Sequence, residues 1–259
     1  MDALSIVYGV EHERTSTSTS FVGATADLAV SKVTSLFAQA TLRPITGLTL
    51  TGGVRHDDYN IYGGHTTFGA NAAYTPNTGR TILRATYAEG FRAPTVTEGL
   101  PPYGNPALKP ETAKSYDVGI EQAMLGDSFH GFITYFHRHN TNLIAGFPSA
   151  NIASALTEGV ELGVRLHPAA TLDFQTSYSF VDAHNKTPGA KYGNQLERRP
   201  RDMANVSIDW VSPWKLAIGA SMLMTGDSFD GYLADSGVNF RYERGRMLAE
   251  LTPANAYRR

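Results

Sequence analysis

The 259-residue sequence predicts an all-β fold, built from up-and-down antiparallel strands that form part of a transmembrane barrel. Two observations lead to this prediction. Apolar residues recur at every second position in about eleven segments, which is the spacing of a strand with one apolar face, and no segment shows a persuasive helical period. The connections between the segments alternate between short turns and long polar loops.

The alternation is clear in residues 157–166, where Val160 and Leu162 share one parity and Glu161 and Arg165 share the other. The other clear segments are residues 48–57, 115–124, 171–179 and 203–210. Weaker alternation is present in residues 4–13, 36–43, 67–75, 82–87 and 216–224. Residues 129–138 are strand-like, but the sequence does not assign their two faces.

The lengths of the connections indicate a membrane barrel. Short turns are predicted at residues 44–47, 76–79, 125–127, 167–169 and 212–213. Long loops are predicted at residues 15–31, 58–65, 92–113, 140–151, 182–199 and 226–236. Outer-membrane barrels have short periplasmic turns and long extracellular loops, whereas soluble sandwiches mix their loop lengths. We therefore expect the N-terminus on the periplasmic side.

The apolar parity is assigned to lipid on energetic grounds. If the two faces of the strand at residues 157–166 were exchanged, Glu161 and Arg165 would lie in hydrocarbon. An arginine at the bilayer midplane costs about 2–4 kcal/mol. The side chains predicted to face the lumen are Arg55, Asp57, Glu121, Glu161 and Arg165. Candidate positions of aromatic girdles are Tyr74, Trp210 and Trp214 beside short turns, and Tyr116 and Tyr178 near loop ends.

Composition excludes several classes of protein. The net charge is −2, so the totals carry no nucleic-acid footprint. The sequence has no cysteine, which removes disulfides and thiolate metal sites. It contains no run of about 18 apolar residues and no signal peptide, so a secreted protein requires a start upstream of Met1.

A three-part motif lies between residues 87 and 121. A strand ends in Gly-Phe-Arg-Ala-Pro, a loop contains Asn-Pro-Ala-Leu-Lys-Pro-Glu, and the next strand reads Ser-Tyr-Asp-Val-Gly-Ile-Glu. The motif residues are Gly90, Phe91, Arg92, Ala93, Pro94, Asn105, Pro106, Leu108, Pro110 and Glu111. This motif resembles the barrel of TonB-dependent receptors, particularly the vitamin B12 receptor-like group, and weaker likeness covers about residues 2–225.

The resemblance implies a receptor in the cell outer membrane that imports vitamin B12 or a ferric siderophore. Its partners would be outer-membrane lipid, the TonB system acting through a plug domain, and cobalamin or an iron–siderophore complex in the intact parent. It implies no cofactor, no metal site and no enzyme activity. The ligand-binding residues are not readable, because selectivity in the family lies in variable loops and in the plug.

The motif residues have expected structural roles. Prolines cannot donate to a strand ladder, so Pro94, Pro106 and Pro110 end pairing and stiffen the loop. We expect Glu111 to accept hydrogen bonds from loop backbone or a neighbouring arginine, and Arg92 to pair with a carboxylate in the wall or to touch the plug. These roles are favoured over direct contact with substrate.

The sequence also departs from the family. No plug is recognisable, and we divide the chain into a partial barrel, residues 1–225, and an atypical tail, residues 226–259, with one possible strand at residues 238–242. We expect no final strand, as in a frame-shifted or truncated gene. Eleven or twelve strands are about half of a roughly 22-stranded barrel, and open edges are costly in lipid, so we expect no transport by this chain alone.

Two other functions stay open: a passive porin-like or structural barrel, and a soluble all-β binding module. No catalytic motif supports an enzyme. The run of residues 137–139 (His-Arg-His) is more typical of a solvated rim than of a metal site. Asp57 and Asp58 are more typical of carboxylates that face the lumen than of calcium ligands. Tyr103 and Phe147 are weaker candidates for stacking on a ligand.

Overall fold

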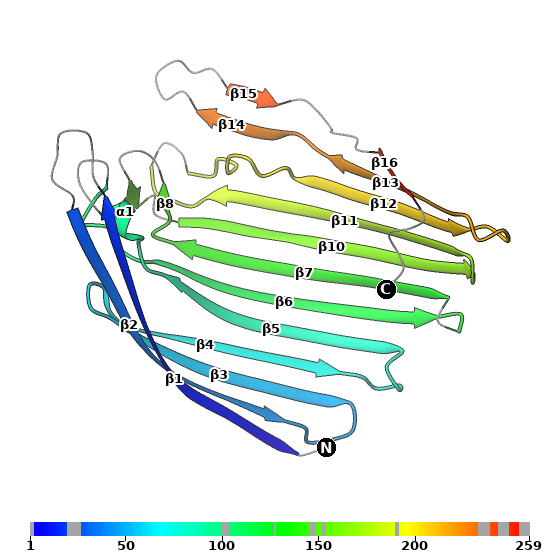
Figure 1. The fold of residues 1–259 in the computed structure, drawn as a ribbon, viewed down its shortest axis with the longest axis horizontal. Helices are drawn as coiled ribbons and strands as arrows, with labels where there is room; N and C mark the ends of the chain where they lie inside the picture. The colour runs from blue at the N-terminus through cyan, green and yellow to red at the C-terminus, as the bar shows by residue number, and fades with distance from the viewer. Residues whose placement is uncertain are drawn as a thin grey trace.

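The computed structural model describes residues 3–19, 27–99, 104–126, 128–145, 149–151, 154–189, 192–232, 239–242 and 249–253. Twelve strands form one antiparallel sheet in the order β1-β2-β3-β4-β5-β6-β7-β10-β11-β12-β13-β16 (Figure 1). Their bounds are β1 (Leu4–Thr19), β2 (Asp27–Leu42), β3 (Leu48–Tyr59), β4 (Gly63–Tyr74), β5 (Thr81–Arg92), β6 (Glu111–Met124), β7 (Phe129–Thr141), β10 (Ser154–Ala169), β11 (Leu172–Asn185), β12 (Asp202–Val211), β13 (Ala217–Thr225) and β16 (Ala249–Pro253).

All eleven predicted strands are present, and the all-β, up-and-down fold is confirmed. The sheet is not closed: among the described strands, β1 and β16 lie at opposite edges. Figure 1 shows the N-terminus at the end of the sheet that carries the short turns, while α1 (Val96–Gly99) lies at the other end. No helix in the described ranges is long and apolar enough to cross a membrane.

The small elements lie outside the large sheet. The two-residue strands β8 (Ile144–Ala145) and β9 (Ala150–Asn151) pair with each other between β7 and β10. Strand β14 (Ser228–Tyr232) pairs with β15 (Asn239–Tyr242), which overlaps the possible strand at residues 238–242. The expectation of no final strand is wrong for the described part of the tail, because β16 pairs antiparallel with β13.

Strands extend further toward the loop end than the sequence predicted. The predicted loop at residues 15–31 is largely strand, since β1 and β2 pair from Leu4–Leu42 up to Thr19–Asp27. The predicted long loop at residues 58–65 is wrong: β3 and β4 pair up to Tyr59 and Gly63, and Gly63 closes the turn with a φ of 71°. At the opposite, short-turn end, the predicted turn at residues 167–169 also belongs to β10, after a register shift. In each case, backbone pairing continues where hydrophobic alternation stops.

Cross-strand register places the side chains on two faces. The pairing from β3 to β10 brings five charged side chains to the same side of the sheet, which we call the polar face: Arg55, Asp57, Glu121, Glu161 and Arg165. We call the opposite one apolar face. It carries large, partly exposed apolar side chains along the whole sheet, including Ile6, Val54, Leu83, Val118, Ile133, Leu162, Ile208 and Ile218.

The register also assigns the faces of β7, which the sequence left open. Ile133 and Tyr135 lie on the apolar face, opposite Leu162 and Val160 of β10. The polar face of β7 carries Phe132, which lies directly opposite Gly163. A Cβ atom added at Gly163 would collide with the Phe132 ring, so this ring lies over the backbone of the next strand. Phe136 over Gly159 and Phe37 over Gly9 repeat the arrangement.

Candidate functional site

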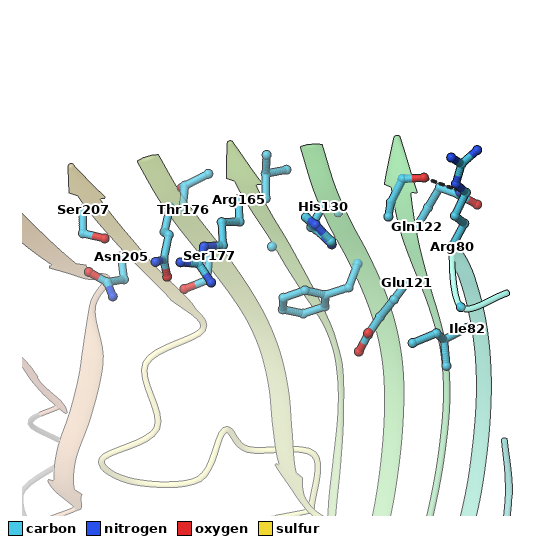
Figure 2. Close-up of a pocket in the computed structure, with 17 residues that line it drawn as sticks. Arg80, Ile82, Glu121, Gln122, His130, Arg165, Thr176, Ser177, Asn205 and Ser207 are labelled. Carbon is cyan, nitrogen blue, oxygen red and sulfur yellow. Dashed lines mark hydrogen bonds between the residues drawn. The ribbon is translucent and has the colours of Figure 1, made fainter. Parts of the chain in front are cut away.

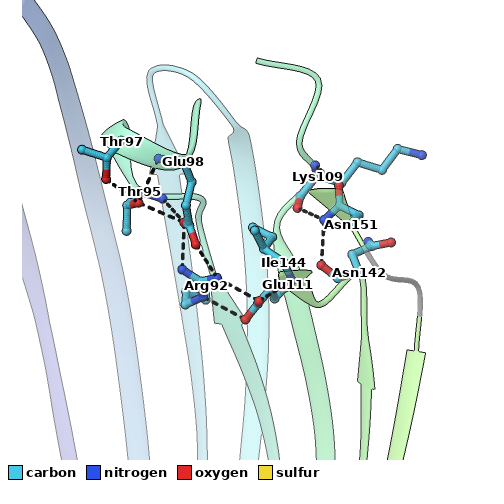
Figure 3. A network of polar contacts seen from close by, with 9 residues as sticks. All are labelled: Arg92, Thr95, Thr97, Glu98, Lys109, Glu111, Asn142, Ile144 and Asn151. Carbon is cyan, nitrogen blue, oxygen red and sulfur yellow. Dashed lines mark hydrogen bonds and ion pairs between the residues drawn. The ribbon is translucent and has the colours of Figure 1, made fainter. Parts of the chain in front are cut away.

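The motif residues form a polar network at the loop end of β5 and β6 (Figure 3). Arg92, the last residue of β5, lies opposite Glu111, the first residue of β6. Its Nε donates to Glu111 Oε2 at 2.8 Å and its Nη2 to Glu111 Oε1 at 2.8 Å. The same guanidinium donates to both carboxylate oxygens of Glu98, at 3.0 and 3.2 Å. The planar fork of arginine therefore binds two carboxylates at once.

Glu98 also caps the single helical turn α1. The Thr95 amide donates to Glu98 Oε2 at 2.7 Å and the Thr95 hydroxyl donates to the same oxygen at 3.0 Å. The Glu98 amide donates back to Thr95 Oγ1 at 3.3 Å, which completes a reciprocal capping box. Burial alone would raise the pKa of the Glu98 carboxyl, but the hydrogen bonds from Arg92 and Thr95 outweigh it and hold this pKa below its ordinary value.

Glu111 and Asn151 link the network to the next long connection. The Ile144 amide of β8 donates to Glu111 Oε1 at 2.7 Å. Asn151 of β9 accepts from the Lys109 amide at 2.8 Å and donates to the carbonyls of Lys109 and Asn142, at 2.9 and 2.7 Å (Figure 3). The connection between β5 and β6 and the one between β7 and β10 are thus joined by side-chain to backbone hydrogen bonds.

The other motif residues pack or turn the chain. The Phe91 ring contacts Tyr59 and His65, with ring centroids 5.6 and 3.8 Å away. Pro94 is buried, and Leu108 is only 5% exposed. The Asn105 side chain accepts from the Ala107 amide at 2.9 Å. Gly90, on the polar face of β5, lies beside Ala113, and Ala93, Pro106 and Pro110 continue the chain through the connection.

A second cluster lies on the polar face of β1, β2 and β3. Arg55 pairs with Asp57 at 2.8 Å and with Glu11 at 3.0 Å. The Ser35 hydroxyl, 1% exposed, donates to Asp57 Oδ1 at 2.5 Å and accepts from Arg55 Nη2 at 2.8 Å. Asp57 is 8% exposed, so its charge is compensated almost entirely by these two partners.

The remaining polar-face charges lie further along the sheet. Glu121 pairs with Arg84 of the neighbouring strand, and Arg165 pairs with Asp173 at 2.8 Å. Glu161 is exposed and has no ion pair or hydrogen bond among the described side chains. Glu121 and Arg165 contribute to a hollow of about 360 Å³ over β5 to β12, which Figure 2 shows together with His130, Gln122, Thr176, Ser177, Asn205 and Ser207.

The alternative metal sites find no geometric support. Asp57 and Asp58 are adjacent in one strand and therefore lie on opposite faces, so they do not share an ion. His137 pairs with Glu158 at 3.2 Å on the apolar face, and Arg138 lies on the other face. No group of three or more His, Cys, Asp or Glu side chains that could hold a metal ion exists in the described part of the chain. Tyr103 and Phe147 lie outside the described residues.

Aromatic residues lie at both ends of the apolar face. Trp210 and Tyr74 lie at the short-turn end on β12 and β4, and Trp214 follows in the next turn with 83% of its surface exposed. At the loop end, Tyr116 is 45% exposed and Tyr178 is 37% exposed. Tyr87 and Tyr135 lie on the same face, although no sequence signal marks them as girdle residues.

The fold therefore defines an antiparallel barrel wall with one apolar and one charged face, which is the class of outer-membrane β-barrel proteins. Residues 4–257 match the family described as TonB dependent receptor-like, beta-barrel, and the chain belongs to this family. It is a family of outer-membrane receptors and transporters rather than of enzymes. The match runs through the tail, past residue 225.

Two curated relatives carry different names. The vitamin B12 transporter BtuB of Photobacterium profundum is 29% identical over 190 residues, which cover 69% of this chain and 30% of the relative. The ferric enterobactin receptor of Pseudomonas aeruginosa is 25% identical over 235 residues, which cover 75% and 31%. The chain thus spans about a third of the length of these relatives.

Solved structures show the same fold. A mutant of the Pseudomonas aeruginosa ferric enterobactin receptor PfeA in complex with enterobactin superimposes with a TM-score of 0.79 at 21% identity, over 96% of this chain and 43% of that one. The copper transporter OprC gives a TM-score of 0.72 at 16% identity, over 88% and 42%. At these identities the likeness establishes the fold of the wall and no ligand.

Proposed function

We propose that this chain forms part of the barrel of an outer-membrane receptor for TonB-dependent uptake of vitamin B12 or a ferric siderophore. In this proposal the apolar face contacts lipid and the polar face, with Arg55, Asp57, Glu121, Glu161 and Arg165, lines the lumen. Family membership supports the transport class, and the names of the two curated relatives support these two ligand types.

The observation that carries the proposal is the network around Arg92. A barrel that only allows diffusion needs no fixed relation between its long loops. Here Arg92 holds the connection between β5 and β6 through Glu98 and Glu111. Glu111 and Asn151 join that connection to the one between β7 and β10. Such preorganisation suits loops that must present a defined surface to a scarce ligand, because less conformational entropy is lost on binding.

Membership in the TonB-dependent receptor family supports TonB as a partner of the full receptor. In our proposal, a plug domain in the full receptor fills the lumen beside the polar face, and TonB acts on that plug. The charges of the polar face have both signs, which suits a wall that contacts a folded domain better than a pore selective for one charge.

Growth experiments test the proposal. The full-length protein that carries this sequence is expressed in a strain without its own vitamin B12 and catecholate siderophore receptors. We expect growth on limiting vitamin B12 or on ferric enterobactin as iron source, and loss of this growth when tonB is deleted. Growth on both nutrients without TonB would instead favour a passive porin, and growth on neither would contradict both proposed ligands.

A further inference from the structure

Two basic side chains face each other on the apolar face at the loop end of β1 and β2. Arg14 and Lys32 are directly opposite in the cross-strand register, and both are exposed. Like charges in such positions repel each other and destabilise the strand pair. Neither side chain has an ion pair or hydrogen bond within the described residues.

The height of this pair on the wall matches a lipid headgroup. On β2 the apolar face begins at Leu42, beside the short turn, and includes Leu36 before it reaches Lys32. Ten residues at about 3.3 Å each, tilted by about 40°, rise by about 25 Å. This is the height of the apolar band of an outer-membrane barrel, so Arg14 and Lys32 lie where hydrocarbon ends.

Other cations at the loop end of the apolar face have acidic partners. Lys114 pairs with Glu89 at 3.2 Å, and Arg201 pairs with Asp182 at 2.7 Å. His137 similarly lies 3.2 Å from Glu158. The wall thus supplies a carboxylate to Lys114 on β6 and to Arg201 just before β12, and it leaves the Arg14–Lys32 pair without one among the described side chains.

The neighbouring acids do not fill this gap. Glu11 and Glu13 lie on the polar face of β1, where Glu11 binds Arg55 and Glu13 accepts from the Thr15 hydroxyl at 3.0 Å. On the apolar face, Asp58 lies opposite Thr34. Thr34 is two residues closer to the short turns than Lys32. Asp58 forms no ion pair within 4.0 Å in the described part of the chain.

His12 lies on the same face, at the next level toward the short turns, with its Nδ1 3.0 Å from Thr34 Oγ1. The surface formed by Arg14, Lys32, His12 and Thr34 therefore offers two cations and further polar groups directly above an apolar wall. We propose that Arg14 and Lys32 bind a phosphate group of an outer-leaflet lipid whose acyl chains lie against Val10 and Leu36. The inference rests on the proposed contact between the apolar face and lipid, and it is independent of which nutrient is transported.

The test uses the full-length protein in detergent micelles and lipid A with its two phosphates as the probe. Replacing both residues, Arg14→Gln with Lys32→Gln, should weaken lipid A binding at least about tenfold, the factor lost with one charge-assisted hydrogen bond. The control is Lys114→Gln, which removes one positive charge, against two in the double variant, from the same face and height but from an existing ion pair. We expect this control to bind lipid A as the unchanged protein does.

A second variant separates binding from folding. Lys32→Glu places opposite charges across the two strands, so the thermal midpoint of unfolding should stay the same or rise while lipid A affinity falls. If the midpoint and the affinity fall together, the effect is on the fold and the inference is wrong.

Two further results would also overturn the inference. One is equal binding of lipid A from which both phosphates have been removed, and the other is full displacement of lipid A by millimolar inorganic phosphate, which would indicate a site for free anions. The uptake assay is separate from these measurements, so a failure of either proposal can be recognised by itself.

Discussion

At the scale of single residues, the guanidinium of Arg92 binds one acid of the family motif, Glu111, together with Glu98, which is not a motif residue. Its five N–H donors lie in one plane and serve Glu111 and Glu98 together. A lysine at this position would keep the charge but could not reproduce the fork. The motif residues that we placed in this network contact protein atoms, and no ligand contact is needed to account for them.

Replacement of Arg92 should loosen the loop end of the wall. In Arg92→Gln two partly buried carboxylates lose their counterion, and we expect local stability to fall by about 1–2 kcal/mol, since partial exposure screens the pairs. Cleavage of the connection between β5 and β6 by proteinase K should become about tenfold faster. The cleavage rate of Arg92→Lys should lie between that of Arg92→Gln and that of the unchanged protein.

Lys109→Gln is the control for this experiment, because the side chain of Lys109 makes no contact in the described network and its backbone alone binds Asn151. We expect its cleavage rate to be unchanged. Equal acceleration in Lys109→Gln and Arg92→Gln would show that loss of any positive charge, rather than the fork, matters.

The network should also respond to acid. The pKa of Glu98 is held below its ordinary value by Arg92 and Thr95 despite burial. Its carboxylate therefore adds stability that is present above the pKa of the unfolded chain and is lost as pH falls through the folded pKa. We expect amide exchange in α1 to be slower than in Glu98→Gln at about pH 6, and the difference to disappear at lower pH as the Glu98 carboxylate is protonated. A difference that persists at the lower pH would contradict this assignment.

Part of this network could be predicted from the residues alone. The expectation that Glu111 accepts hydrogen bonds from backbone or an arginine describes its contacts with Ile144 and Arg92. The role of Glu98 is not predicted, although Thr95 and Glu98 have the spacing of a capping box, because a single helical turn has no hydrophobic period that would reveal it. Asn151 carried no signal for its role, since its partners come from a distant connection.

At the scale of elements, the glycines opposite phenylalanines explain how large rings fit on a face that carries charges. Phe132 and Phe136 lie against Gly163 and Gly159 of the next strand, where no side chain competes for the space. The rings cover backbone that would otherwise be exposed on the polar face. The same strand, β7, carries Ile133 on its apolar face, so both parities contain large apolar residues.

Filling one of these spaces should destabilise the sheet. In Gly163→Ala the new methyl group meets the Phe132 ring, and overpacking of this kind costs about 1–3 kcal/mol. Gly69→Ala is the matched control, because Gly69 lies on the same face and a Cβ there has only one neighbour, the Tyr87 carbonyl oxygen at 3.9 Å. Urea unfolding in detergent measures both; equal stability of the two variants would contradict the packing argument.

This arrangement is also why sequence alternation could not assign the faces of β7. Alternation reports which side of a strand meets lipid only when the other side is polar. In β7 the second apolar set is accommodated by glycines that lie in β10, more than 20 residues later in the chain. The strand lengths predicted from alternation are too short for a related reason: residues 15–19 of β1 are polar at both parities, while their backbone still pairs with β2.

At the scale of the whole molecule, one assignment supports the rest: the apolar face contacts lipid and the polar face contacts water or protein. Fold class and family were predictable, because period-two alternation and the motif around Arg92 are local in sequence. The edges of the sheet were not, since β16 joins β13 from a tail without clear alternation.

Labels on neighbouring residues test the assignment. Spin labels at Val54 and Ile208, on the apolar face, should be quenched by a fat-soluble reagent in reconstituted vesicles. Labels at Arg55 and Ser207, each next in sequence to one of these positions, should respond to a water-soluble reagent instead. If all four respond only to the water-soluble reagent, the chain does not span a membrane in this orientation.

Among the described strands, β1 pairs only with β2, and its other edge determines which side chains a neighbouring strand must carry. Within lipid, every backbone amide and carbonyl along that margin needs a hydrogen-bonding partner, so another strand must lie against it. The side chains of that strand must match those of β1. They must be apolar opposite Leu4, Ile6, Tyr8 and Val10, and hydrophilic or small at the positions between. Any polypeptide that completes this wall can be recognised by that pattern before its structure is known.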